Sequence, residues 1–147
     1  MKKEKVLEDN LKLEILMSTM NKTSLSFLDA IFPNQKLNAL HILIINQTEI
    51  GKELHSDFEN IRIINSYEKG LSKSRNLAIK NALGDICLIA DDDIEYVEDF
   101  EKIIINGFQK FDNASVIRFK IDTFSGETYK AYPKHSKKLI SKSEIEL

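Results

Sequence analysis

The sequence predicts an α/β fold with an open, mostly parallel central sheet and helices on both faces. Two observations predict it. Short apolar runs of strand length alternate along the chain with amphipathic stretches of helix length, which is the pattern of repeated β-α units. Only five glycines and two prolines occur in 147 residues, so we expect the elements to be regular and closely joined.

Five short apolar runs are the expected strands, and they cover residues 13–19, 39–46, 61–64, 86–90 and 116–121. The second run is interrupted only by His41, so we expect it to be buried on both faces of the sheet. Four helices are expected, at residues 24–32, 50–57, 71–83 and 97–111. Pro33 stops the first helix and Gly84 the third, because proline and glycine commonly follow helix ends.

Composition limits the class of protein. Apolar residues make up 42% and charged residues 30%, which is typical of a soluble globular domain. The net charge of -2 excludes a polyanion binder that works by bulk charge. The single cysteine, Cys87, excludes an internal disulfide and a cysteine-rich zinc site, and it predicts a reducing, cytoplasmic setting. No apolar run approaches the roughly 18 residues that a membrane-spanning helix needs.

Three consecutive aspartates, Asp91, Asp92 and Asp93, follow the predicted strand 86–90. Ligands of open α/β sheets bind beyond the carboxyl ends of strands. Because alternate residues at a strand end point the same way, we expect Asp91 and Asp93 to face one ligand while Asp92 turns aside. Their hard oxygens suit Mg²⁺ or Mn²⁺, with phosphate oxygens and water completing the coordination. The alternative is capping of the following helix, which accounts for one aspartate but poorly for three.

The helix predicted at residues 71–83 begins among basic residues. Lys69, Lys73 and Arg75 surround its first turn, where the helix dipole disfavours cations. A sequence that breaks a local rule often does so at a functional site, and a basic helix start beside a flexible Gly70 is a good phosphate site. The alternative is a set of solvated charges on a surface helix. The nearby aspartates favour phosphate.

Other polar residues predict no further site. His41, His55 and His135 share no metal-ligand spacing. Residues 128–143 contain five lysines and no acid. Few aromatic residues lie among these lysines, so we expect no nucleic-acid partner.

Residues 70–96, GLSKSRNLAIKNALGDICLIADDDIEY, resemble the central signature of family 2 glycosyltransferases, which have the GT-A fold. In that family a Gly-Leu-Ser-x-x-Arg-Asn helix start is followed by Gly-Asp or Gly-Glu, an apolar strand and an Asp-x-Asp motif. Both motifs occur here at their usual separation. The resemblance implies a Rossmann-like, three-layer α/β/α fold and the transfer of a sugar from a nucleotide-diphosphate donor to an acceptor hydroxyl.

The resemblance also implies roles for individual residues. Asp91 matches the first Asp of the motif, near the ribose and the metal. Asp93 matches the second, which coordinates the Mn²⁺ or Mg²⁺ ion that bridges the diphosphate. Arg75 and Asn76 match a pair that lines the nucleotide pocket. The other residues expected to bind the nucleotide sugar are Thr19, Asn21, Asn46, Gln47, Lys73 and Asp92.

Two departures from the family pattern bear on function. Where the family commonly has Asp-Asp-x-Ser, this chain has Asn46-Gln47-Thr48, and an amide can both accept and donate hydrogen bonds. A UDP-sugar is the favoured donor, but the identity of the nucleotide base stays open. The family's catalytic base is an Asp or Glu in the half that follows the donor site. The chain ends before such a region, so we expect the base to be absent from it and the catalytic residue is unknown.

We therefore expect a charged extension at residues 1–12, a donor-binding GT-A core at 13–125, and the start of an incomplete acceptor-side region at 126–147. The leading hypothesis is a metal-dependent, inverting glycosyltransferase of bacterial surface or capsular polysaccharide synthesis. Its acceptor would be a glycan or a lipid-linked sugar, and it would act in the cytoplasm or peripherally at the inner face of the membrane.

The alternative is a non-catalytic nucleotide-sugar-binding fragment or subunit. We expect the 147-residue chain by itself to bind donor but to transfer no sugar. An apolar sheet edge beside residues 116–121 would favour homo-oligomers.

Overall fold

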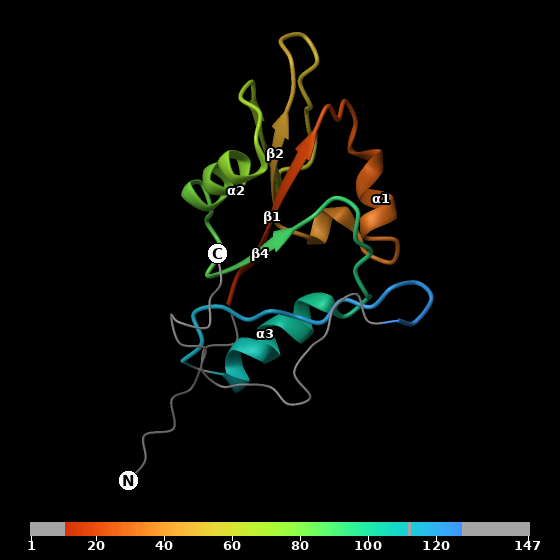
Figure 1. Cartoon of the computed structure of the whole chain (residues 1–147), viewed down its shortest axis with the longest axis vertical. Coiled ribbons are helices and arrows are strands. Elements are labelled where there is room, and N and C mark those ends of the chain that lie inside the picture. Colours follow the sequence, from red (N-terminus) through yellow and green to blue (C-terminus); the bar gives the residue numbers. More distant parts are fainter. Residues whose placement is uncertain (1–10, 112, 128–147) are drawn as a thin grey trace. The chain divides into compact units, whose positions relative to one another are not determined.

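The computed structural model describes residues 11–111 and 113–127 and contains a four-stranded parallel sheet (Figure 1). Its strands are β1 (Leu13–Met20), β2 (Ile42–Gln47), β3 (Ile61–Ser66) and β4 (Ile86–Ala90). They lie in the order β3-β2-β1-β4, and every neighbouring pair is parallel. The predicted α/β class with a mostly parallel central sheet is confirmed.

Helices flank the sheet. A 3₁₀ turn, η1 (Leu25–Phe27), leads into the short helix α1 (Leu28–Ile31), and a second turn, η2 (Leu37–Ala39), precedes β2. Helix α2 (Leu71–Lys80) connects β3 to β4, and α3 (Phe100–Lys110) follows β4. Figure 1 shows α1 and α2 on opposite sides of the sheet, which gives the three layers that the sequence predicted.

The core beneath α2 fixes the position of that helix on the two central strands. Leu16 of β1, together with Leu43 and Ile45 of β2, forms a buried cluster with Ala78 of α2. All six residues of β2 are buried, as expected for a strand that is covered on both faces. The small side chain of Ala78 allows the helix to approach the sheet closely, so the first turns of α2 are held near the carboxyl ends of the strands.

Several elements have different bounds from those predicted. The predicted helix 24–32 is divided between η1 and α1. The predicted strand 39–46 begins only at Ile42, because η2 ends at Ala39 and the next two residues connect it to the strand. The predicted helix 97–111 begins at Phe100. The predicted helix 71–83 ends at Lys80, and Gly84 then passes close to β1. A Cβ on Gly84 would stand 2.6 Å from the Cβ of Glu14, so this approach requires glycine.

The prediction of a helix at residues 50–57 is wrong, because an irregular loop lies there. The Asn65 side chain accepts a hydrogen bond from the Leu54 N–H at 2.9 Å and donates one to the Leu54 carbonyl at 2.9 Å. Leu54 itself is buried. The Asn65 amide therefore pairs with both backbone groups that Leu54 would use in a helix, and it fixes the loop on β3.

The prediction of a fifth strand at residues 116–121 is also wrong. These residues have no strand ladder, and an isolated bridge is assigned only at Asp122. A Cβ on Gly107 of α3 would stand 3.3 Å from the Phe119 ring and 3.6 Å from Ile117. The apolar side chains therefore pack against a helix, and their alternation does not reflect pairing in the sheet.

The chain divides into two compact units, Met1–Ile105 and Asn106–Leu147, and the boundary falls within α3. The predicted segments 1–12 and 126–147 lie almost wholly outside the described residues, so the predicted domain organisation stays a prediction. In the part of the chain that the structure describes, no helix is long and apolar enough to cross a membrane.

Candidate functional site

Polar side chains gather at the carboxyl ends of β1 and β4. β2 and β3 extend the sheet on one side of β1, and β4 joins it on the other, so the strand order reverses at β1. Ligands of open α/β sheets bind at such a reversal, outside the carboxyl ends of the strands. Thr19 lies near the end of β1, and Asp91 follows the last residue of β4.

Arg75 and Asp91 form an ion pair at this point. Nη2 of Arg75, in the second turn of α2, donates to Oδ1 of Asp91 at 2.5 Å. The side chains remain 35% and 47% exposed. Nε of Arg75 is buried and has no hydrogen-bond partner among the described residues. The exposed part of the pair therefore keeps donor and acceptor capacity that a ligand can use, whereas Nε lies beneath the surface.

Asp92 is bound to the end of β1. The Thr19 hydroxyl donates to Oδ2 of Asp92 at 2.5 Å, and Nζ of Lys22 lies 3.7 Å from the same oxygen. Thr19 is only 3% exposed. The sequence predicted that Asp92 turns aside from Asp91 and Asp93, and these contacts locate its carboxylate against β1. The Thr19 hydroxyl is therefore already hydrogen-bonded within the protein, and it positions the turn formed by residues 91–93, called the aspartate turn below.

Asp93 is the exposed member of the triplet. Within residues 11–111 and 113–127, no three Asp, Glu, His or Cys side chains converge on one point. Mg²⁺ and Mn²⁺ prefer oxygen ligands, so the chemistry of Asp93 and Asp91 fits either ion. Because Mg²⁺ takes about six ligands, two carboxylates leave further coordination positions to be filled by groups other than the described residues.

The side-chain amides of the last two residues of β2 are buried and hydrogen-bonded to the backbone. Oδ1 of Asn46 accepts from the Lys22 N–H at 3.1 Å, and its Nδ2 donates to the Lys22 carbonyl at 3.0 Å. Oε1 of Gln47 accepts from the Gly70 N–H at 2.6 Å. Asn46 is 0% exposed and Gln47 4%. Their oxygens therefore fix the loop after β1 and the loop before α2.

The remaining asparagines predicted to bind nucleotide are both exposed. Asn21 adopts a left-handed conformation (φ 54°), and its N–H donates to the Gln47 carbonyl at 2.9 Å. Asparagine is one of the few residues that tolerate this conformation well. Asn76 lies on the surface of α2, one position beyond Arg75. Both side chains are accessible to a ligand.

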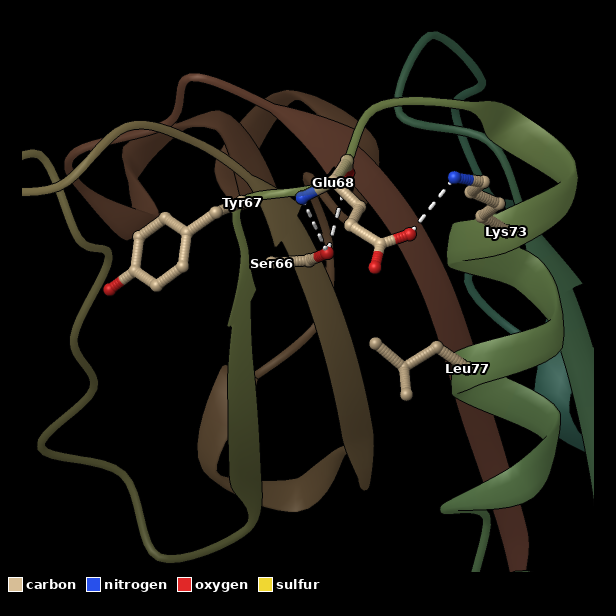
Figure 2. A pocket seen from close by; sticks show the side chains of 5 residues that line it. All are labelled: Ser66, Tyr67, Glu68, Lys73 and Leu77. Atoms are coloured by element: carbon tan, nitrogen blue, oxygen red, sulfur yellow. Dashed lines mark hydrogen bonds and ion pairs between the residues drawn. The ribbon is translucent and has the colours of Figure 1, made fainter.

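Lys73 lies beside a separate, open cavity of about 530 Å³. Figure 2 shows this cavity between the end of β3 and the start of α2, where it is lined by Ser66, Tyr67, Glu68, Lys73 and Leu77. Nζ of Lys73 donates to Oε2 of Glu68 at 2.9 Å. The cavity is thus on the β3 side of α2, whereas Arg75 faces the aspartates that follow β4, and Lys73 is not paired with those aspartates.

Two residues outside the sequence prediction support the aspartate turn. Lys22 contacts Asp92, as described above. Tyr96 stacks on Phe32, with 5.2 Å between ring centroids, and its N–H donates to the Ile31 carbonyl at 2.8 Å. Burial and the nearby Asp91 raise the pKa of Tyr96 to about 12, so its hydroxyl stays protonated. The sequence signal for Lys22 was its place after β1, but its partner is distant in the chain.

Comparison with known proteins adds a family to this geometry. The chain matches the model described as Glycosyl transferase family 2 over residues 27–145. No curated protein and no solved structure matches the chain. The matched range includes α2, β4 and the three aspartates, and it excludes β1 with Thr19 and Lys22.

Proposed function

The chain belongs to glycosyl transferase family 2, and on that premise we propose that it binds a nucleotide-diphosphate sugar at the carboxyl ends of β1 and β4. The observation that carries the proposal is the convergence of Arg75, Thr19 and Lys22 on Asp91 and Asp92, where the strand order reverses. Ligands bind at this place in open α/β sheets. A UDP-sugar is the favoured donor.

Each residue has a proposed role in this site. Arg75 donates to the donor nucleotide through the exposed part of its guanidinium, since the side chain is 35% exposed. Asp93 and Asp91 would hold Mg²⁺ or Mn²⁺ against the diphosphate, and the ion would supply positive charge where negative charge develops on the leaving group. Thr19 positions Asp92, while the exposed Asn21 and Asn76 border the nucleotide.

We propose an inverting transfer for the reaction. A base removes the proton of the acceptor hydroxyl as its oxygen attacks the anomeric carbon, and the bond from that carbon to the diphosphate oxygen breaks with its electron pair leaving on the diphosphate. The proposed acceptor is a glycan or a lipid-linked sugar in bacterial surface or capsular polysaccharide. The proposed location is the cytoplasm or the inner face of the membrane, which the single cysteine supports.

A second candidate is binding of the nucleotide sugar without transfer. Asp91 and Asp92 are both paired with cations, and Asp93 is assigned to the metal. None of the three is therefore a free base for an acceptor hydroxyl. This pairing favours a binding module as the alternative.

Calorimetric titration with UDP, GDP, CDP and ADP tests donor binding, with Mn²⁺ and with EDTA. We expect one of the four to bind with Mn²⁺ and at least tenfold more weakly with EDTA or in Asp93→Asn, because EDTA removes the ion and the variant removes one of its proposed carboxylate ligands. Glu68→Gln is the matched control, since Glu68 is an exposed acid that pairs with Lys73 across the separate cavity. Equal affinity with and without metal would contradict the metal assignment. Radiolabelled nucleotide sugars then separate transfer from binding alone.

A further inference from the structure

The loop after β1 is fixed at Lys22 by hydrogen bonds from a buried amide. The fully buried Asn46 amide pairs with both the N–H and the carbonyl of Lys22, at 3.1 and 3.0 Å. The second proton of Asn46 Nδ2 goes to Oδ1 of Asn65 at 3.1 Å. A buried amide is stable only when its hydrogen bonds are made, so these contacts hold the backbone of Lys22 in one place.

The side chain of Lys22 has neighbours that position it, but its ammonium makes no hydrogen bond to the described residues. Its Nζ lies 4.9 Å from the centre of the Phe27 ring and 3.7 Å from Oδ2 of Asp92, and the side chain is 34% exposed. A distance of 3.7 Å is longer than a hydrogen bond. Among the described residues Nζ makes no hydrogen bond, so all three of its protons remain available to a ligand.

Two other lysines show the contrast. Lys52 and Lys73 each reach a glutamate at 2.9 Å, and their side chains are 63% and 67% exposed. Those are solvated surface pairs that form hydrogen bonds. Lys22 is instead half-buried beside an acid that the Thr19 hydroxyl already binds at 2.5 Å. Asp92 therefore keeps the ammonium in position without using its donors.

Lys22 and Arg75 bring two cations to consecutive aspartates from two different elements, one from the loop after β1 and the other from α2. A lysine ammonium is a compact point charge and a common phosphate ligand. We propose that Lys22 is a binding residue for the diphosphate of the donor, with Nζ moving from its loose pairing with Asp92 to a phosphate oxygen. This inference rests on the proposed function, because it assumes that the diphosphate lies at the aspartate turn.

The test compares a charge-removing variant with a charge-retaining one. Lys22→Met keeps an apolar stem on Phe27 and removes the charge, and Lys22→Arg keeps the charge. Lys52→Met is the matched control, because Lys52 also pairs with an acid but lies in the loop between β2 and β3. Each protein is titrated with UDP, GDP, CDP and ADP in the presence of Mg²⁺, and with the corresponding nucleosides by NMR.

We expect Lys22→Met to weaken binding of the preferred nucleoside diphosphate about tenfold or more, because a charge-assisted contact is lost. Nucleoside affinity should be unchanged, Lys22→Arg should keep most of the affinity, and Lys52→Met should match the natural chain. The loss should shrink in high salt, which screens partly exposed charges. Thermal unfolding of Lys22→Met should be close to that of the natural chain.

Two outcomes would overturn the inference and leave the proposed function intact. In one, the natural chain binds a nucleoside diphosphate and Lys22→Met binds it equally well. In the other, Lys22→Met loses nucleoside and nucleoside diphosphate affinity to the same extent, which would make Lys22 structural. If the natural chain binds none of the four diphosphates, the proposed function itself fails and the inference fails with it.

Discussion

Two arginine–carboxylate pairs lie at opposite ends of the sheet, and they differ in how far their hydrogen-bonding capacity is used. Arg62 and Glu14 meet at 2.8 Å near the amino ends of the strands. Arg75 and Asp91 meet at 2.5 Å beyond the carboxyl ends. The distances are similar, so it is the surroundings that separate a pair that supports the fold from one that can serve a ligand.

The Glu14 pair is closed, in the sense that its hydrogen-bonding capacity is used within the protein. Glu14 is 2% exposed, and its second oxygen accepts from the N–H groups of Leu83 and Gly84 at 2.5 and 3.0 Å. Arg62 also donates to the Asn81 carbonyl at 2.8 Å. Burial opposes ionisation of Glu14, but the hydrogen bonds from Leu83, Arg62 and Gly84 together lower its pKa. The pair therefore fixes the segment that follows α2, residues 81–84, to β1.

The Asp91 pair is open, in the sense that part of its hydrogen-bonding capacity is exposed and unused. The Asp91 side chain is 47% exposed and has Arg75 as its hydrogen-bond partner among the described residues. Nε of Arg75 is buried with its proton unused. The exposed part of the guanidinium and the free oxygen of Asp91 are therefore the groups that a ligand can reach. The comparison therefore identifies the carboxyl end as the end with binding capacity.

The largest expected effect is on stability, at the closed pair. Glu14→Ala should lower the free energy of unfolding by about 3 kcal/mol, because it leaves two backbone N–H groups without their acceptor and removes the carboxylate partner of Arg62. Glu68→Gln, which breaks an exposed pair, should change it by less than about 0.5 kcal/mol. Urea denaturation measures both. A loss below about 1 kcal/mol for Glu14→Ala would mean that the closed pair is not structural.

The next effect separates the two arginines. Arg75→Ala should weaken nucleoside diphosphate binding by about 1.5–3 kcal/mol, the value of a desolvated charge-assisted contact, with little change in stability. Arg62→Ala should lower stability and leave the affinity of the folded protein unchanged. Calorimetry and urea denaturation on both variants measure this, and the reverse pattern would exchange the roles assigned to the two pairs.

A smaller effect concerns pH. Because the folded pKa of Glu14 lies below its ordinary value of 4.5, its contribution to stability is fully present above pH 4.5 and is lost as pH falls through the folded pKa. The stability difference between the natural chain and Glu14→Ala should therefore narrow as pH falls below 4.5. Denaturation curves at several acidic values measure it. A difference that widens on acidification would contradict the sign of the shift.

The two residues of the open pair could be singled out from the sequence because their signals are local, although the pairing between them was not predicted. Arg75 stands in a basic helix start, Asp91 directly follows an apolar strand, and the two lie 16 positions apart. The α/β class and the four strands of the sheet followed from the same kind of local pattern. Both partners were therefore singled out before their contact was known.

The closed pair could not be predicted, because it depends on which strands become neighbours. Glu14 and Arg62 are 48 positions apart, and each alone reads as one charge in an apolar run. Lys22 and Asp92 are likewise separated by most of the described chain. The wrong elements have the same cause. The Asn65 amide overrides helix formation around Leu54, and packing of Phe119 on Gly107 replaces strand pairing.

The most direct test of the central claim, that the carboxyl end of the sheet binds the donor, is an NMR titration of ¹⁵N-labelled chain with UDP and Mg²⁺. It compares the two ends of one molecule in a single experiment. The predicted result is that amide signals of Thr19, Lys22, Arg75 and Asp91 shift, while those of the closed pair do not. Shifts confined to the residues around Glu14 and Arg62, with the aspartate turn unaffected, would contradict it.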